Sequence, residues 1–162
     1  MTIEPLRKLI IDEENPASVI HSARTAVAAV LSLLVARLFR LPEAYWAAIT
    51  TLIVMQSTLG AALPISAQRF AGTALGAAAG GMLATYFPGN VLAFGAGVFV
   101  VGILCAALRV ARSAYRFASI TLAILMLVPR SNSGWAVALH RSLEVSVGIA
   151  VGLFVSAVWP ET

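Results

Sequence analysis

The chain has 162 residues, of which 60% are hydrophobic and only 11% are charged, and its mean hydropathy is +0.92. A soluble domain carries about a quarter charged residues, so this composition excludes an ordinary water-soluble fold and indicates a protein whose main solvent is lipid. The net charge of +4 comes from arginines at the ends of apolar segments rather than from one basic cluster, which argues against a nucleic-acid-binding surface and is typical of membrane topology.

A segment of mixed charge, residues 1–18, precedes the first apolar run, and it lacks the pattern of a cleaved secretory signal. Apolar residues recur in it at helical spacing beside Arg7 and Lys8, which is typical of an amphipathic helix that lies on a membrane surface. We therefore expect residues 1–18 to form a cytoplasmic N-terminal segment and residues 19–162 to form one transmembrane domain.

Six apolar runs follow, each near the roughly 20 residues that cross a bilayer as a helix. Proline or glycine separates most of them, at Pro42, Pro64, Pro88 and Pro129, and arginines mark the remaining connection. The pattern predicts an all-α fold, an integral membrane bundle of six transmembrane helices. Their approximate bounds are Val19–Phe39, Ala44–Leu63, Phe70–Phe87, Val91–Leu108, Ala114–Val128 and Trp135–Trp159.

The distribution of arginines predicts the orientation of the bundle. If the N-terminus lies inside, the cytoplasmic segments hold more Arg and Lys residues than the outer segments do. Because positive charge concentrates on the cytoplasmic side of membrane proteins, we expect both termini in the cytoplasm. In a bacterium this chain would be a multi-pass protein of the inner membrane.

An internal repeat relates the two halves of the chain, about residues 19–90 and 91–162. A shift of 72 residues places Arg69 on Arg141 and pairs further arginines and glycines, namely Arg37 with Arg109, Arg40 with Arg112, Gly76 with Gly148 and Gly80 with Gly152. Three helices in each half would give the two copies opposite orientations across the membrane. The pattern predicts the 3+3 inverted repeat that many transporters contain.

Small residues line one face of the third and sixth apolar runs at spacings of three and four. This spacing lets helix backbones approach closely in lipid, so we expect these runs to be central packing helices, with direct lining of a pore as the alternative. The residues are Gly72, Gly76 and Gly80 in one run and Gly148, Gly152 and Ser156 in the other.

Several longer motifs accompany these stripes. They are Arg69-Phe-Ala-Gly72-Thr73-Ala-Leu-Gly76-Ala-Ala-Ala-Gly80, preceded by Ala44-Tyr45-Trp46-Ala47 and Val54-Met55-Gln56-Ser57, and followed by Arg141-Ser-Leu-Glu144 and the stretch from Gly148 to Trp159-Pro160. With these motifs the chain resembles the fusaric acid resistance protein family over nearly all of residues 20–160. That family includes bacterial exporters of aromatic acids and is related to the plant aluminium-activated malate transporters. The resemblance implies efflux of organic anions.

The resemblance also implies an assembly. Larger members of the family contain two such six-helix units and a cytoplasmic domain, whereas this chain has one unit. Since a second copy supplies what one polypeptide lacks, we expect a homodimer or a higher homo-oligomer.

An anion that crosses a membrane needs positive charge along its path, and arginine supplies a planar set of charged donors for a carboxylate. Arg24 lies about one turn inside the first run, where it either snorkels to the interface or faces the substrate path. Arg69 and Arg141 begin their runs and either anchor them at the interface or attract substrate. Glu144, one turn later, is a partner for Arg141.

The second run has the most polar interior. Tyr45 and Trp46 form either an interfacial aromatic anchor or a stacking surface for an aromatic substrate. Gln56 either binds a substrate carboxylate or links helices. The remaining candidates on the substrate path are Thr50 in this run and Tyr115 and Arg116 at the mouth of the fifth run.

These observations favour a secondary exporter of organic, in particular aromatic, carboxylate anions. Its expected partners are the lipid bilayer, a small organic anion and a periplasmic adaptor. The sequence contains no GxxxxGK[ST], HExxH or GxSxG motif, so we expect neither an enzyme nor a cofactor or metal ion. Two alternatives stay open: a passive anion channel, and a membrane subunit with a structural or assembly role, which the stripes of small residues suit equally well.

Overall fold

The computed structural model describes residues 19–55, 59–128 and 133–159. Within these ranges every regular element is a helix, and the bounds are α2 (Val19–Leu38), α3 (Tyr45–Val54), α4 (Leu59–Tyr86), α5 (Val91–Ala107), α6 (Arg112–Leu127) and α7 (Gly134–Val158). The prediction of an all-α fold is confirmed for this part of the chain. The predicted amphipathic segment, residues 1–18, lies outside the described residues.

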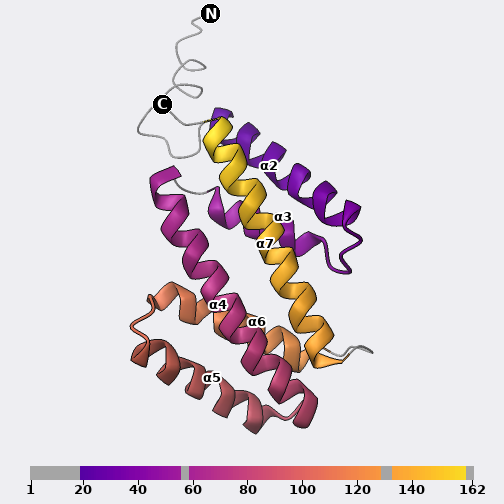
Figure 1. The fold of residues 1–162 in the computed structure, drawn as a ribbon, viewed down its shortest axis with the longest axis vertical. Coiled ribbons are helices and arrows are strands. Elements are labelled where there is room, and N and C mark those ends of the chain that lie inside the picture. Colours follow the sequence, from indigo (N-terminus) through magenta and orange to yellow (C-terminus); the bar gives the residue numbers. More distant parts are fainter. Residues whose placement is uncertain (1–18, 56–58, 129–132, 160–162) are drawn as a thin grey trace, which may run out of the picture.

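Two long helices, α4 and α7, run side by side in opposite directions through the middle of the molecule (Figure 1). The helices α2 and α3 pack on α7, whereas α5 and α6 pack on α4. Each pair of shorter helices therefore packs mainly on the long helix from the other half of the sequence. This exchange makes the packing of each half depend on the other.

The second and third apolar runs are divided at a different place from the predicted one. Helix α3 ends at Val54 rather than Leu63, and α4 begins at Leu59 and continues through Pro64. The prediction that Pro64 separates two helices is wrong: Pro64 is the sixth residue of α4, where a proline loses the hydrogen bond to the carbonyl of Gly60 and crowds that carbonyl, which can bend a helix without ending it. As a result, α3 has only 10 residues, a length of about 15 Å.

The first helix of each half ends in the same backbone motif. After α2 the N–H groups of Arg40 and Leu41 donate to carbonyls of the last turn at 2.9 and 3.1 Å, and after α5 the N–H groups of Arg109 and Val110 do the same at 3.1 and 2.9 Å. These bonds form a Schellman cap, in which φ is 53° at Arg40 and 52° at Arg109. The cap makes Arg40 and Arg109 structural equivalents, whereas the uniform shift of 72 residues pairs Arg37 with Arg109.

Glycines bring α4 against α6, and α7 against α3, at the distance of backbone contact. A Cβ at Gly76 would overlap the backbone of Ala118, and a Cβ at Gly148 would overlap the carbonyl oxygen of Ala47. The small-residue faces of α4 and α7 are thus turned toward α6 and α3. The other predicted packing residues lie on the same two contacts: Gly72 and Gly80 against α6, Gly152 against α3, and the buried Ser156, whose hydroxyl donates to the sulfur of Met55 at 3.3 Å.

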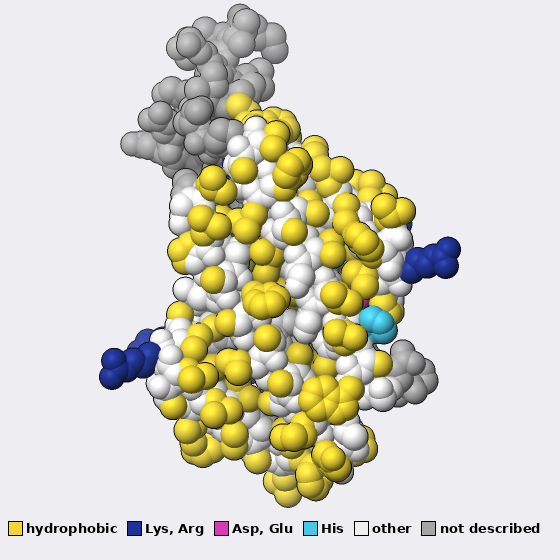
Figure 2. All heavy atoms as spheres, viewed as in Figure 1, with side chains coloured by type: hydrophobic (Ala, Val, Ile, Leu, Met, Phe, Trp, Pro, Cys, Tyr) yellow, Lys and Arg dark blue, Asp and Glu magenta, His cyan; other side chains and the backbone are white. Residues whose placement is uncertain are grey.

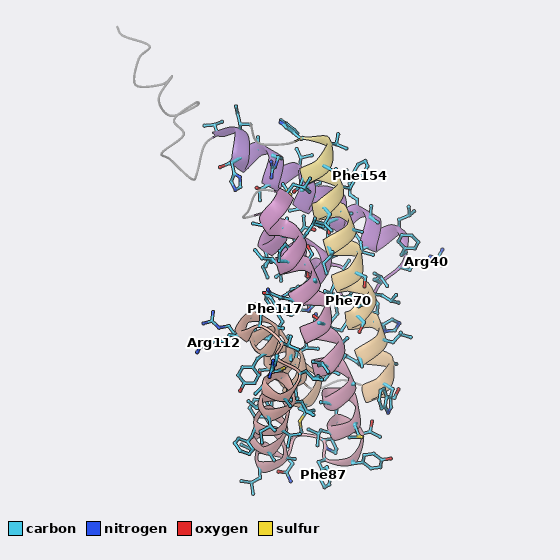
Figure 3. All side chains as sticks on the ribbon, turned by 60° about the vertical axis from the view of Figure 1, so that its left-hand side comes forward. Arg40, Phe70, Phe87, Arg112, Phe117 and Phe154 are labelled. Carbon is cyan, nitrogen blue, oxygen red and sulfur yellow. The ribbon has the colours of Figure 1, made fainter. Side chains whose placement is uncertain are left out.

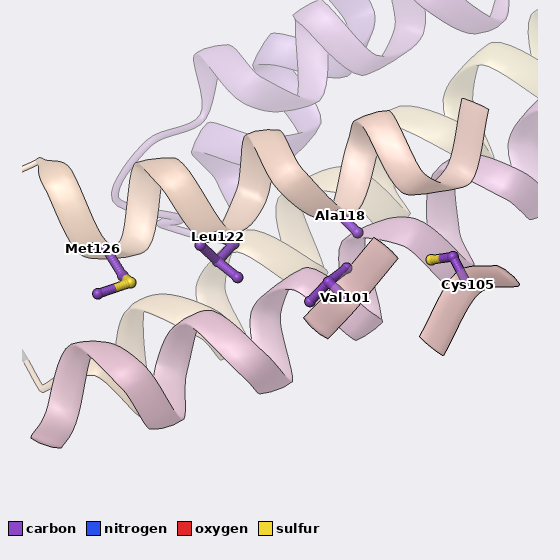
Figure 4. Packing of buried hydrophobic residues seen from close by; sticks show 5 residues of the cluster. All are labelled: Val101, Cys105, Ala118, Leu122 and Met126. Atoms are coloured by element: carbon purple, nitrogen blue, oxygen red, sulfur yellow. The ribbon is translucent and has the colours of Figure 1, made fainter. Parts of the chain in front are cut away.

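The outer surface of the bundle is apolar. Inside, Val101, Cys105, Ala118, Leu122 and Met126 join α5 to α6 (Figure 4). Large apolar side chains are exposed on each of the described helices and cover most of the face shown in Figure 2, where basic groups stand at the edges. Helices α2 and α7 have the length and hydropathy of a membrane span, and only 22% and 39% of their most apolar windows are buried in the molecule. An apolar surface of this extent fits lipid rather than water.

Candidate functional site

Two buried arginines, one from each long helix, converge on α3. The side chains of Arg69 in α4 and Arg141 in α7 are 5% and 3% exposed. The prediction that both arginines begin their helices is wrong, because α4 starts ten residues before Arg69, at Leu59, and α7 starts seven residues before Arg141, at Gly134. An interfacial anchor keeps its guanidinium at the surface, so the burial of both side chains favours a role inside the bundle.

Arg141 has two carboxylates and an aromatic ring around it. Its guanidinium carbon lies 3.7 Å from the ring centroid of Trp46 in α3, a cation–π contact. Its Nη1 lies 3.7 Å from a carboxylate oxygen of Glu144 and 3.7 Å from one of Glu43. Glu144 is 1% exposed, and its Oε1 also accepts a hydrogen bond from the backbone N–H of Glu43 at 2.9 Å. This group of side chains is therefore an ion-paired junction between α7 and the start of α3.

Arg69 has an aromatic ring and a hydroxyl around it, and no ion pair within the described part of the chain. Its guanidinium carbon lies 4.5 Å from the ring centroid of Phe117 in α6. Figure 3 shows Phe117 where α6 comes against α4. Its Nη2 donates to the hydroxyl of Thr50 at 3.2 Å, and its buried Nε has no acceptor among the described residues. The two groups that contact the Arg69 guanidinium are thus both neutral.

The two arginines come close to each other through α3. Trp46, which lies under Arg141, and Thr50, which binds Arg69, are four residues apart in this helix. Side chains at that spacing occupy the same face, about 5–6 Å apart at their Cβ atoms. One face of α3 therefore receives both guanidinium groups.

Several donors around these arginines have no acceptor within the described residues. Besides Arg69 Nε they include the indole Nε1 of Trp46 and the hydroxyl of Ser66, which stands one turn before Arg69 in α4. A buried donor without an acceptor costs free energy, and a ligand that only accepts hydrogen bonds, such as a carboxylate, satisfies it. Among the described residues, no cluster of three or more His, Cys, Asp or Glu side chains is placed to hold a metal ion.

Arg24 lies at the opposite end of α7 from this cluster. Its Nη1 donates to the carbonyl of Trp159, the C-cap residue of α7, at 2.9 Å, and its side chain is 1% exposed. A cation near the carbonyl end of a helix stabilises the helix dipole. The described contact is therefore a helix cap. A snorkelling arginine would extend its guanidinium to the interface, whereas the side chain of Arg24 is buried.

The ring contacts, hydrogen bonds and ion pairs described for the two buried arginines do not include three further predicted residues, Tyr45, Tyr115 and Arg116. Tyr45 is 52% exposed, although its ring lies 5.6 Å from that of Trp46. Tyr115 packs against α5 at Gly102, and Arg116 is exposed. Gln56 lies outside the described residues. Of the ten predicted path residues, the cluster brings together Trp46, Thr50, Arg69, Arg141 and Glu144.

Sequence reasoning missed two members of the cluster, Phe117 and Glu43. A repeat alignment with its own offset for each helix would have found Phe117, because Trp46-Ala-Ala-Ile-Thr-Thr-Leu-Ile-Val-Met55 aligns with Phe117-Ala-Ser-Ile-Thr-Leu-Ala-Ile-Leu-Met126. For Glu43, a lone acidic residue after Pro42, the sequence carries no comparable signal.

Comparisons with known proteins agree with a membrane location. A sequence profile described as "Fusaric acid resistance protein-like" matches residues 28–155. The chain is 27% identical over 150 residues to the "Inner membrane protein YeeA" of Escherichia coli (strain K12), a match that covers 88% of this chain and 41% of that protein. The chain thus spans less than half the length of this relative. No solved structure matches it.

Proposed function

We propose that this chain, which belongs to the fusaric acid resistance protein-like family, is a membrane transporter that exports organic, in particular aromatic, carboxylates. The observation that carries the proposal is Arg69, a buried guanidinium without an ion pair in the described part of the chain, inside a bundle with an apolar surface. A buried charge is costly unless something compensates it. A bound carboxylate supplies that compensation.

The proposed location is the inner membrane, with six spans and both termini in the cytoplasm. Two features support it: the relative of Escherichia coli is named as an inner membrane protein, and α2 and α7 are long and apolar, with most of their apolar windows not buried in the molecule. The shorter helices α3 and α5 are also apolar. The 10-residue α3 covers only about half of the roughly 30 Å of hydrocarbon, so the proposed second span is a short or discontinuous helix, and transporters commonly place their substrate at such helices.

The proposed architecture is an inverted repeat of three plus three helices. Its support is the antiparallel course of α4 and α7, the identical caps after α2 and α5, and the match between the segments 46–55 and 117–126. The arginine contacts follow the same relation, since Arg69 and Phe117 correspond to Arg141 and Trp46. In an inverted repeat, the substrate site lies between the two copies, which is where these arginines converge.

The proposed assembly is a homodimer or a higher homo-oligomer, served in export by a periplasmic adaptor. Symmetric association of identical copies is the usual form of such an assembly.

Counterflow in proteoliposomes tests the transport function. Purified protein is reconstituted with an excess of unlabelled 4-hydroxybenzoate or succinate inside, and the uptake of the same labelled acid from outside is followed with and without a pH gradient. An exporter gives saturable, trans-stimulated uptake. The variant Arg69→Met loses it, whereas Arg112→Met, which changes an exposed arginine that points away from the bundle (Figure 3), keeps it.

The same assay separates the alternatives. Flux that does not saturate and is not trans-stimulated identifies a passive anion channel. Absence of flux of either acid, from protein that remains folded in the liposomes, contradicts transport and favours a structural subunit. The variant Arg24→Gln tests the role of Arg24. If Arg24 lies on the substrate path, the variant has a lower flux. If Arg24 only caps α7, the variant has a lower thermal stability and an unchanged flux per folded molecule.

A further inference from the structure

We infer that the arginine cluster binds a single carboxylate at Arg69 and that Glu144 sets this preference for monoanions by neutralising Arg141. The inference rests on the proposed transport function and adds to it the charge of the substrate and the residue that selects it.

The first step is the count of charges around each guanidinium. Arg141 lies 3.7 Å from carboxylate oxygens of both Glu144 and Glu43. Arg69 donates to the neutral hydroxyl of Thr50 and lies over the neutral ring of Phe117. The two buried cations are therefore not equivalent. A ligand with one negative charge matches Arg69, while a second negative charge would meet an Arg141 that already has its carboxylates.

The second step explains why Arg69 has no carboxylate of its own. Glu144 follows Arg141 by three residues, and Gly72 follows Arg69 by the same interval. Glu144 extends to the backbone N–H of Glu43 before α3, whereas Gly72 is pressed against the backbone of Ala114 in α6. Helix α6 thus occupies the space that a carboxylate side chain at position 72 would need. The missing countercharge follows from the close packing of α4 on α6.

The third step concerns the hydrogen-bonding groups near Arg69. Its Nε is buried without an acceptor in the described residues, as is the hydroxyl of Ser66 one turn earlier in α4, and the indole N–H of Trp46, the ring under Arg141, is in the same state. An ionised carboxylate has two oxygens that only accept hydrogen bonds. It can therefore satisfy the charge and the open donor of Arg69 at once, and a guanidinium binds it in a planar geometry.

Equilibrium binding to the full-length protein in detergent tests this inference. The probes are 4-hydroxybenzoate and terephthalate, which share a ring and differ in the second carboxylate, and the dissociation constants are measured at pH 7.5 by isothermal titration calorimetry. We expect the wild type to bind 4-hydroxybenzoate at least tenfold more tightly than terephthalate. Arg69→Met should lose at least tenfold in affinity for 4-hydroxybenzoate, and Arg69→Lys, which keeps the charge, should recover part of it.

The selectivity variants change the carboxylates of Arg141. Glu144→Gln removes the buried carboxylate beside Arg141 and leaves the partly exposed one of Glu43, so terephthalate should bind at least tenfold more tightly than to the wild type, with 4-hydroxybenzoate changed less than threefold. Glu43→Gln removes the partly exposed carboxylate and should give about a threefold shift in the same direction. If Glu144→Gln fails to fold, Glu43→Gln alone tests whether the carboxylates beside Arg141 set the preference for monoanions.

The outcomes separate this inference from transport itself. If the wild type binds 4-hydroxybenzoate and neither glutamate variant changes the ratio of the two affinities, the inference is wrong while the transport function stands. The same holds if Arg69→Met binds as the wild type does. If the wild type binds neither acid and shows no counterflow, the inference and the proposed function both fail.

Discussion

The two halves of the molecule build the same contact and then differ at one position. In each, a buried arginine of a long helix lies over an aromatic ring at the start of a helix from the other half, Arg141 on Trp46 and Arg69 on Phe117. Glu144 then follows Arg141 where Gly72 follows Arg69. The comparison teaches that a repeated architecture can hold a compensated ion pair in one half and an uncompensated cation in the other.

The difference between the ion-paired Arg141 and Arg69, which has no ion pair among the described residues, gives the two arginines different roles, one in stability and one in ligand binding. A compensated pair contributes to holding helices together, because removal of either partner leaves a buried charge behind. An uncompensated cation weakens the folded state and is available to a ligand. The same substitution at the equivalent position of each half should therefore have different effects.

The largest expected contrast is between Arg141→Met and Arg69→Met. Loss of Arg141 leaves Glu144 buried with its main cation gone, so we expect a loss of about 3–5 kcal/mol in the free energy of unfolding. Loss of Arg69 removes one hydrogen bond and one cation–π contact, but it also removes the desolvation cost of a buried charge and strands no carboxylate, so we expect a net change below about 1 kcal/mol. Reversible chemical unfolding in detergent measures both. Equal losses in the two variants would remove the distinction between the halves.

The glycine contacts should give the next largest effect. The substitutions Gly76→Ala and Gly148→Ala each place a methyl group against the backbone of the facing helix. We expect each to lower the free energy of unfolding by about 1–3 kcal/mol. Gly95→Ala in α5 is the matched control, because a Cβ there meets nothing within 4 Å. It should be neutral or stabilising by about 0.5–1 kcal/mol. The fraction of monodisperse protein in size-exclusion chromatography and the unfolding midpoint report both changes.

The cation–π contacts should differ in strength. Trp is the best aromatic partner for a cation and lies closer to its arginine, at 3.7 Å against 4.5 Å for Phe117. Double-mutant cycles with leucine at the aromatic position should give a coupling free energy of about 1–2 kcal/mol for Arg141 with Trp46 and about 0.5–1 kcal/mol for Arg69 with Phe117. A larger coupling in the Phe117 cycle would contradict the geometry.

The smallest effect concerns a feature that the halves share. Arg40 and Arg109 adopt a left-handed backbone that L-residues disfavour by about 1–2 kcal/mol. Since glycine is the usual residue of this cap, Arg40→Gly and Arg109→Gly should each stabilise the protein by about 0.5–1 kcal/mol in thermal unfolding. Arg37→Gly, inside α2, is the control and should destabilise by about 1 kcal/mol. A lower midpoint in both cap variants would count against the assigned caps.

Much of the fold follows from local patterns in the sequence. Composition and apolar runs predict the helices, and the family resemblance is confirmed by the profile match to residues 28–155. The division between α3 and α4 was not predictable in the same way. The polar segment from Gln56 reads as the interior of a span and Pro64 as a break, whereas α3 ends at Val54 and Pro64 lies inside α4.

The candidate site was predictable in its residue types and not in its contacts. Arginines and a glutamate in apolar runs are conspicuous because lipid disfavours them, and Arg69, Arg141 and Glu144 stand out for that reason. Their partners lie far away in the sequence, since α4 packs on α6 and α7 packs on α3. Phe117 and Glu43 become neighbours only through this exchange of long helices. A periodicity of three or four residues carries no information about it.

The hydrogen bond from Arg24 to the carbonyl of Trp159 imposes an order on biogenesis. The donor and its acceptor are 135 residues apart, and ribosomes add about 5–20 residues per second. Arg24 is therefore synthesised roughly 7–27 seconds before its partner carbonyl exists. During this interval the guanidinium must be accommodated by water, lipid head groups or the insertion machinery. Closure of this contact then marks the docking of α7 on α2.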